Sequence, residues 1–337
     1  MTTHQNQEQP EPKKLGSSKK PSLFKKQTEP IFMSPLDDPV LNAIFDNVKN
    51  AGLAAQSLVG SILQEDGHRI KRVISVVPQR YYKIYPNKRG CRVDILIETE
   101  DNETIIAEVQ TSKEPMGTRN LFEAAQVILA NSPKGSDVWK HNKIMPRIYI
   151  INILDFILRD NHDDAIQPVG ILYAKGTSDV AIPNLRIYNV QLPLFRTKEH
   201  DFDKPLDAWL YILDTAHQKE IPVGEVIAMN EKLKKTVEAD LGLKQFTRQY
   251  ARASASAKTQ KEWAMYCSEK MRMKGMLWAA ESTGEARGRT EGQLQDIRNL
   301  MVSMNMSAEQ AMKALLIPQS EISHYTTLLQ DSNGDIR

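Results

Sequence analysis

Three polar side chains, Asp94, Glu108 and Gln110, interrupt two short apolar segments of the chain. The segments, residues 91–98 and 104–110, are rich in β-branched residues and are separated by a short polar turn. This pattern predicts a β-hairpin. An acid inside such a hairpin is costly to bury unless it has a partner. Two carboxylates on neighbouring strands would form an oxygen site suited to Mg²⁺.

The length of the turn decides whether the two acids can meet. Residues 108 and 110 lie two apart and therefore share one face of their strand. A three-residue loop centred on Asp101 places Asp94 directly opposite Glu108. A two-residue loop places Asp94 opposite Val109 and turns Glu108 to the other face. A shared metal site therefore requires the longer loop or a bulge.

This arrangement suits metal-dependent hydrolysis of phosphodiesters. Asp94, Glu108 and the backbone carbonyl of Val109 would hold the metal ion. The ion would lower the pKa of a bound water and neutralise charge on the phosphate. Gln110 would orient the attacking water, because an amide donates and accepts hydrogen bonds but is not a strong base.

Residues outside the hairpin could complete such a site. An acid at the start of the first predicted helix, Asp38 with Asp37 as the alternative, would add a carboxylate. Arg119 opens a predicted helix over residues 118–130 and could contact a phosphate. Gln126 follows seven residues later on the same helical face. Taken alone, Asp38 also fits an ordinary helix cap, and Arg119 also fits a surface cation.

The two hairpin acids also allow a structural interpretation. Asp94 could cap a strand end, and Glu108 could form an ion pair with Arg92 or Lys113. The spacing alone does not separate these roles from catalysis. A catalytic pair requires both carboxylates to point to the same side of the sheet.

Composition restricts the class of protein. The 337-residue chain is 41% hydrophobic with a net charge of +2, which is typical of a globular protein. The first 33 residues hold six lysines and three glutamates and so carry +3, which leaves the remainder at −1. Nucleic-acid binding would therefore need a local basic patch. The two cysteines form no zinc-binding spacing and no disulfide framework.

No membrane segment is expected, because the longest dense apolar stretch, residues 148–158, is too short to span a bilayer. No secretory signal is visible at the N-terminus. We therefore expect a cytoplasmic protein.

The chain is predicted to have four parts. Residues 1–33 have the composition of a disordered tail, and residues 34–203 alternate helical and strand patterns that indicate a mixed α/β layer. Residues 204–284 form a helical extension, and residues 285–337 form a short helical unit. Glycines at 284, 288 and 292 predict an interruption between these two helical parts.

The last predicted helices resemble a helix-turn-helix. Ser307 to Gln310 matches a capping box at the start of one of them. The alternative interpretation is a small bundle used for self-association. A homodimer could therefore form through the C-terminal helices.

Several segments, taken in order, resemble the PD-(D/E)XK nuclease family of transposases, also called recombination-promoting nucleases. The resemblance extends from about residue 34 to the C-terminus. The segments that carry it are residues 34–45, 92–95, 106–110, 148–156, 189–195, 209–210 and 288–292, together with Arg119.

The resemblance implies an α/β fold with a restriction-endonuclease-like mixed sheet flanked by helices, followed here by an α-helical C-terminal extension. It implies Mg²⁺ dependence, with Mn²⁺ as a substitute, and DNA cleavage that promotes recombination. Asp94 and Glu108 become metal ligands by motif match, and Asp38 becomes the helix-borne acid.

This sequence departs from the family pattern in two places. Gln110 stands where the superfamily name places Lys, as is common in this branch. Residues 40–43 lack a Lys that often occurs in the opening segment. The alternative function is a catalytically degenerate DNA-binding or self-associating module of the same fold.

Overall fold

A computed structural model describes residues 32–46, 48–82, 90–113, 116–131, 147–158, 164–169, 182 and 184–331. The predicted disordered tail at residues 1–33 lies outside these ranges except for its last two residues. The chain divides into two compact units. Residues 37–39 and 257–337 form the second unit, and the remaining residues form the first. Each unit is described by itself.

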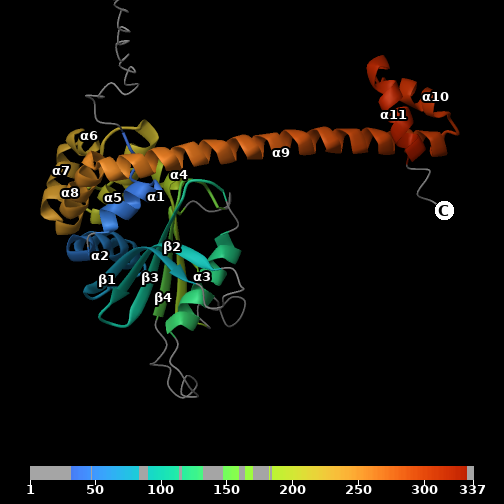
Figure 1. The fold of residues 1–337 in the computed structure, drawn as a ribbon. Helices are drawn as coiled ribbons and strands as arrows, with labels where there is room; N and C mark the ends of the chain where they lie inside the picture. The colour runs from blue at the N-terminus through green and yellow to red at the C-terminus, as the bar shows by residue number, and fades with distance from the viewer. Residues whose placement is uncertain are drawn as a thin grey trace, which may run out of the picture. The chain divides into compact units, whose positions relative to one another are not determined.

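Within the described residues, the first unit contains a six-stranded mixed sheet with the strand order β1-β2-β3-β4-β6-β5 (Figure 1). Strands β1 to β3 are antiparallel, β3, β4 and β6 are parallel, and β5 pairs antiparallel with β6. The predicted mixed α/β sheet is therefore confirmed. The strands are β1 (Val73–Tyr82), β2 (Cys91–Thr99), β3 (Glu103–Gln110), β4 (Arg147–Leu154), β5 (Ile166–Val169) and β6 (Leu185–Gln191).

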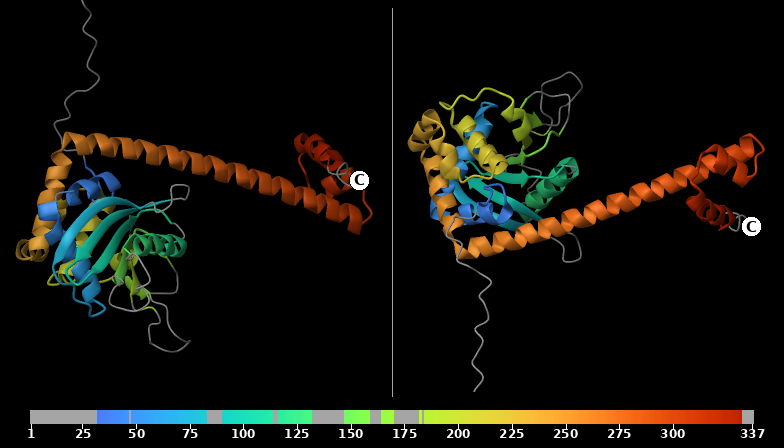
Figure 2. Two further views of the ribbon diagram at one scale, coloured as in Figure 1. Left: turned by 60° about the horizontal axis from the view of Figure 1, so that its bottom comes forward. Right: turned by 90° about the horizontal axis from the view of Figure 1, so that it is seen from above.

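Helices flank the sheet, as two further views show (Figure 2). Before the sheet come α1 (Asp38–Phe45) and α2 (Val48–Gln64), and α3 (Met116–Asn131) follows β3. The chain then continues through α4 (Leu192–Arg196), α5 (Pro205–Lys219), α6 (Val223–Ala228), α7 (Glu231–Ala239) and α8 (Leu241–Ala255). Helices α5 to α8 belong to the same compact unit as the sheet. The four-part division of the chain stays a prediction. No helix in the described ranges has a stretch that is long and apolar enough to cross a bilayer.

Helix α3 packs on one face of the sheet. Its Ala124 and Val127 join a buried cluster with Leu96, Ile106, Ile148 and Ile150 of the strands. Side chains alternate between the two faces along a strand. Tyr149 therefore points to the opposite face, where its ring stacks on His68 with 4.9 Å between the ring centroids.

The turn between β2 and β3 sets the register of the hairpin. Residues 100–102 form the loop, and the amide of Asn102 donates a hydrogen bond to the Thr99 carbonyl at 3.2 Å. Asn102 has a positive φ of 59°, a conformation that Asn tolerates better than most residues. The loop holds Ile95 opposite Ala107. Of the two loop lengths considered, the structure has the three-residue loop, and its register brings Asp94 and Glu108 to the same level.

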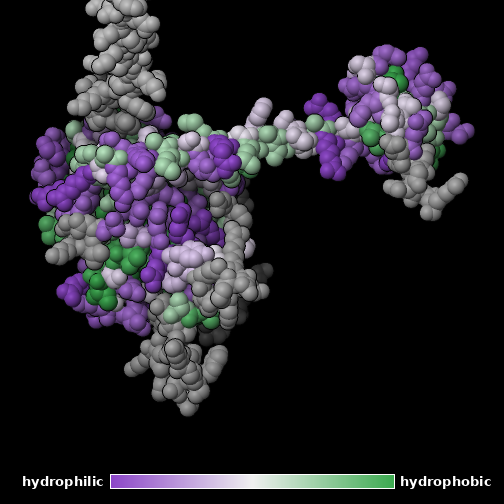
Figure 3. Space-filling view, in the orientation of Figure 1, coloured by the Kyte–Doolittle hydropathy of each residue, from purple (hydrophilic) through white to green (hydrophobic). Residues whose placement is uncertain are grey.

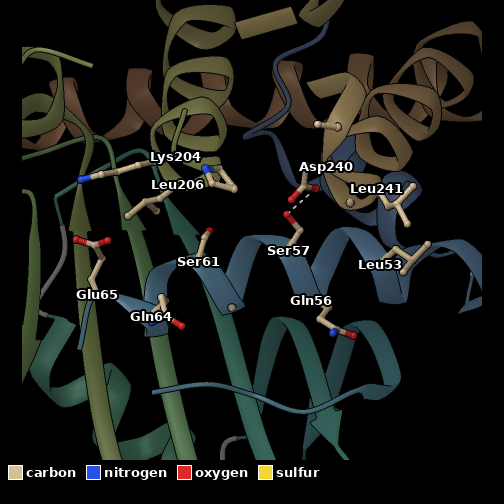
Figure 4. Close-up of a pocket in the computed structure, with 14 residues that line it drawn as sticks. Leu53, Gln56, Ser57, Ser61, Gln64, Glu65, Lys204, Leu206, Asp240 and Leu241 are labelled. Carbon is tan, nitrogen blue, oxygen red and sulfur yellow. Dashed lines mark hydrogen bonds between the residues drawn. The ribbon is translucent and has the colours of Figure 1, made fainter. Parts of the chain in front are cut away.

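Helices α2 and α8 pack closely at Gly242. A Cβ atom at this position would lie 2.2 Å from the Cβ of Ser57 and 2.4 Å from the carbonyl oxygen of Leu53. The Ser57 hydroxyl donates to Asp240 at 2.9 Å (Figure 4). It also accepts from the Trp209 indole at 2.8 Å. This contact ties the later helices to the helix that contacts β1.

The second unit contains α9 (Ala257–Ser303), α10 (Ala308–Ala314) and α11 (Gln319–Asp331). The end of α9 packs with the two short helices around a small core. Its buried members are Ile297, Ala311, Met312, Ile317 and Tyr325. Ser307 and Gln310 form the predicted capping box, with both reciprocal hydrogen bonds present.

Helix α9 runs without a break through Gly284, Gly288 and Gly292 (Figure 1). The predicted interruption is therefore wrong. A glycine costs a helix only about 1 kcal/mol relative to alanine. Good helix formers separate these glycines, and an ion pair between Arg287 and Glu291 at 2.7 Å spans one turn of the same segment.

The packing at Gly242 predicts an effect of one added methyl group. Gly242→Ala should lower the free energy of unfolding by about 1–3 kcal/mol, because neither backbone nor a short side chain can move aside cheaply. Gly224→Ala is the control, since a Cβ there meets nothing within 4 Å. Urea unfolding of both variants is the measurement. Equal stability of Gly242→Ala and the wild type would contradict the close packing.

Candidate active site

Asp94 and Glu108 bond to each other's strands where the β2–β3 ladder ends. The amide of Asp94 donates to Oε1 of Glu108 at 2.9 Å, and the amide of Val109 donates to Oδ2 of Asp94 at 3.0 Å. The last residues paired in the β2–β3 ladder are Ile95 and Ala107. Just beyond them, the two side-chain carboxylates accept the backbone N–H groups of Asp94 and Val109. Glu108 is fully buried, while Asp94 is half-buried. The two acids therefore converge at one place rather than on opposite faces.

Arg119 of α3 contacts this pair of acids from the helix side. Its Nη2 donates to Oε2 of Glu108 at 2.6 Å. The cation in this contact is Arg119, and not Arg92 or Lys113, which the sequence suggested as partners of Glu108. Arg119 was predicted to contact a phosphate, and here its guanidinium is turned toward Glu108.

Glu123 is a site residue that the sequence did not indicate. Its Oε1 accepts a hydrogen bond from Nε of Arg119 at 2.8 Å, one turn along α3, and the side chain is buried. The i,i+4 spacing from Arg119 was a signal that could have found it. Asp94, Glu108 and Glu123 thus place three carboxylates around one guanidinium.

Gln110 lies on the same face as Glu108 and is buried. With its amide turned so that both polar atoms are satisfied, its oxygen accepts from Nη1 and Nη2 of Arg119 at 2.6 and 3.0 Å. The neutral amide therefore lies beside a cation that comes from α3. A positive charge thus lies next to Gln110.

Burial raises the pKa of Glu108 to about 9, and the charges of Asp94 and Glu123 add to the rise. Arg119 and the amide of Asp94 oppose it. Burial also raises the pKa of the nearby Cys91 thiol to about 11, with further contributions from Glu123 and Glu108. The local environment thus disfavours negative charge, as expected where acids outnumber cations.

The other predicted residues lie elsewhere on the helices. Asp38 opens α1, and its role as a helix-borne acid stays a prediction. The alternative, Asp37, accepts a hydrogen bond from the Trp263 indole at 2.8 Å within the second unit. Gln126 lies on α3 and, within the described residues, its Oε1 is buried without a hydrogen-bond partner. Its contact with a phosphate stays a prediction.

The chemistry of the cluster fits a divalent cation. Two carboxylates and nearby backbone carbonyls are hard oxygen donors, and excess negative charge is relieved by a bound cation. Among the described residues, no three His, Cys, Asp or Glu side chains form a ready metal centre. The protein would therefore supply a small donor set, and water would complete the coordination.

Residues 35–270 match the model of the PD-(D/E)XK nuclease family transposases. The match covers well over half of the chain. The protein belongs to this family. Its mixed sheet and flanking helices are those of a restriction-endonuclease-like fold. No curated protein and no solved structure matches the chain.

Membership in the PD-(D/E)XK family supports a nuclease-type function. Nucleases of this family generally use divalent metal ions. The assignment of the two acids of the motif name to Asp94 and Glu108, with Gln110 at the Lys position, stays a prediction. It is the basis of the function proposed below.

The raised pKa of Glu108 predicts a pH-dependent stability in metal-free protein. Between about pH 4.5 and pH 9 the folded state keeps a proton on Glu108 that the unfolded chain releases, so the free energy of unfolding falls as pH rises. Glu108→Gln cannot ionise and should flatten this slope.

Urea unfolding in the presence of a chelator measures the slope for each variant. Glu98→Gln, which removes an acid from the neighbouring strand β2, is the control and should keep the wild-type slope. Parallel curves for wild type and Glu108→Gln would show that Glu108 does not titrate in this window.

Proposed function

We propose that the protein is a metal-dependent DNA endonuclease that hydrolyses phosphodiester bonds and thereby promotes recombination. One observation carries the proposal most directly. Asp94 and Glu108 exchange backbone hydrogen bonds across one hairpin in a chain of the PD-(D/E)XK nuclease family. Beyond the nuclease-type function of the family, the proposed function specifies DNA as the substrate, phosphodiester hydrolysis as the reaction, and Asp94 and Glu108 as central residues.

Asp94, Glu108 and the backbone carbonyl of Val109 would hold Mg²⁺, with Mn²⁺ as a substitute. When bound, the ion supplies Lewis acidity and a water of lowered pKa. Gln110 orients the attacking water through its amide, and Asp38 contributes a further acid from α1. The donor set matches the hard oxygen ligands that these ions prefer.

Arg119 and Gln126 would contact the DNA phosphates. The Arg119 guanidinium contacts both Glu108 and Glu123. Its side chain is 29% exposed, so it can also reach a ligand at the surface of the site. A guanidinium that binds carboxylates in this way has the geometry to bind phosphate.

A plasmid-nicking assay with Mg²⁺ tests the proposal. Asp94→Asn and Glu108→Gln should each lower the cleavage rate by more than about 100-fold, because each removes a ligand that no other residue replaces. Glu98→Gln should cleave at the wild-type rate, since Glu98 lies on β2 with Asp94 but outside the cluster of acids. Chelation should stop cleavage by every variant.

Equal activity of wild type and Asp94→Asn would trace any cleavage to a contaminant. Inactivity of the wild type on supercoiled, linear and single-stranded DNA, with Mg²⁺ or Mn²⁺, would reject the endonuclease.

A second function, self-association, is favoured by an exposed apolar face on α9. Met273, Met276, Leu277 and Ala280 recur at the i, i+3, i+4, i+7 spacing of one helical face. Met276 is 56% exposed and Leu277 is 65% exposed. Hydrophobic side chains are visible along this helix in Figure 3. The occupant we propose for this face is α9 of a second copy of the chain, which would give the homodimer expected for double-strand cutting.

Leu277→Lys should convert a dimer to a monomer, because it places a charge in the centre of the paired face. Light scattering after gel filtration measures the mass in solution. Ser282→Lys adds the same charge on another side of α9 and should leave the dimer intact. A monomeric wild type would reject pairing through α9.

A further inference from the structure

A row of polar side chains continues from Glu108 across the sheet. Glu108 pairs in register with Asn152 of β4, Asn152 pairs with Asn189 of β6, and Asn189 pairs with Gln167 of β5. Paired residues on neighbouring strands point to the same face, with strands about 4.8 Å apart. The row therefore lies on the face covered by α3, and Asn152 is the nearest member to Glu108.

The row interrupts an apolar sheet. Asn152 is 0% exposed and Asn189 is 5% exposed, and the residues before Asn152 in β4 are buried isoleucines. Burying an amide costs about 1–3 kcal/mol unless hydrogen bonds compensate. Two adjacent buried amides in a layer of isoleucine therefore suggest a role beyond packing.

Asn152 is held in one orientation. Its Nδ2 donates to Oδ1 of Asn189 at 2.8 Å. This bond leaves Oδ1 of Asn152 to face away from Asn189, and in the described part of the chain that oxygen has no hydrogen-bond partner. The pair thus presents a fixed, buried acceptor beside Glu108.

A second acceptor of this kind comes from α3. Asn120 directly follows Arg119 and is 3% exposed. Within the described ranges its Oδ1 is also buried without a hydrogen-bond partner. The two unsatisfied oxygens therefore belong to residues adjacent to Glu108 in the sheet and adjacent to Arg119 in the helix. Both oxygens accept hydrogen bonds, so a ligand that satisfies either of them must donate.

A hydrated cation supplies such donors. Two carboxylates and one carbonyl leave several positions of an octahedral ion to water, and Mg²⁺ retains such waters. Each water bound to a cation donates its protons outward. Groups that accept these hydrogen bonds orient the ligands and tune the metal site.

We infer that Asn152, held by Asn189, is a positioning residue that accepts a hydrogen bond from a water on the cation of the proposed active site. Asn120 accepts from the same hydration shell on the helix side. The inference rests on the proposed metal-dependent function and extends it to β4, β6 and the buried face of α3. An ordered water without a cation is the competing occupant.

Calorimetric titration of the full chain with Mn²⁺ separates these occupants. Asn152→Leu keeps a similar volume and removes the acceptor, so Mn²⁺ affinity should fall about 10–100-fold. Gln167→Leu removes another amide from the same row at the far edge of the sheet and should bind Mn²⁺ as the wild type does. Asp94→Asn should abolish binding.

Two failures can be told apart. If neither wild type nor Asp94→Asn binds Mn²⁺, the proposed metal-dependent function fails. If wild type binds and Asp94→Asn does not, but Asn152→Leu binds with wild-type affinity, only the role of Asn152 is lost.

Asn152→Asp covers the case in which Asn152→Leu does not fold. It keeps the acceptor oxygen and adds a negative charge next to the cation's water shell. The rise in melting temperature caused by Mn²⁺ should then exceed that of the wild type. If Mn²⁺ raises the melting temperature of Asn152→Asp by the same amount as that of the wild type, Asn152 stabilises the sheet and does not position the cation.

Discussion

Two carboxylates that accept backbone N–H groups from each other's strands set the conditions for everything around them. Past Ile95 and Ala107, the side chains of Glu108 and Asp94 take the amides of Asp94 and Val109. Side-chain oxygens thus satisfy amides that a regular ladder would pair with backbone carbonyls. These hydrogen bonds fix both acids in place, but they also bring acidic groups together in a buried position, where negative charge is costly.

The rest of the site responds to that charge. Arg119 bonds to Glu108, Glu123 and Gln110 at once, so one guanidinium serves two acids and an amide. Gln110 follows Glu108 on β3 and is neutral, so the cation beside these two residues is Arg119 of the next helix, α3.

The two units differ in how they bury apolar surface. The first closes its sheet between helices, and Gly242 allows α8 to approach α2 closely. The second leaves much of α9 exposed, including Trp278 at 73%. A helix whose apolar side chains face solvent gains stability from a partner. The first unit contains the proposed active site, and the second exposes the apolar residues on which the proposed self-association depends.

Local chemistry fixed much of the hairpin. Asn102 accepts the positive φ of a three-residue loop, and that loop alone sets which residues of β2 and β3 are level. The period of two then puts Gln110 on the face of Glu108. For this reason Asp94, Glu108 and Gln110 could be identified from residues that are close in sequence.

Only the tertiary structure could add Asn120, Asn152 and Asn189. The parallel pairing of β3 with β4 joins residues more than forty positions apart, as Glu108 and Asn152 show, and no local pattern specifies that register. Likewise, which face of α3 meets the sheet depends on the cluster around Ala124 and Val127. The sequence determined the acids and their turn. Long-range packing decided which neutral and charged groups surround them, because those neighbours are chosen by contacts between distant segments.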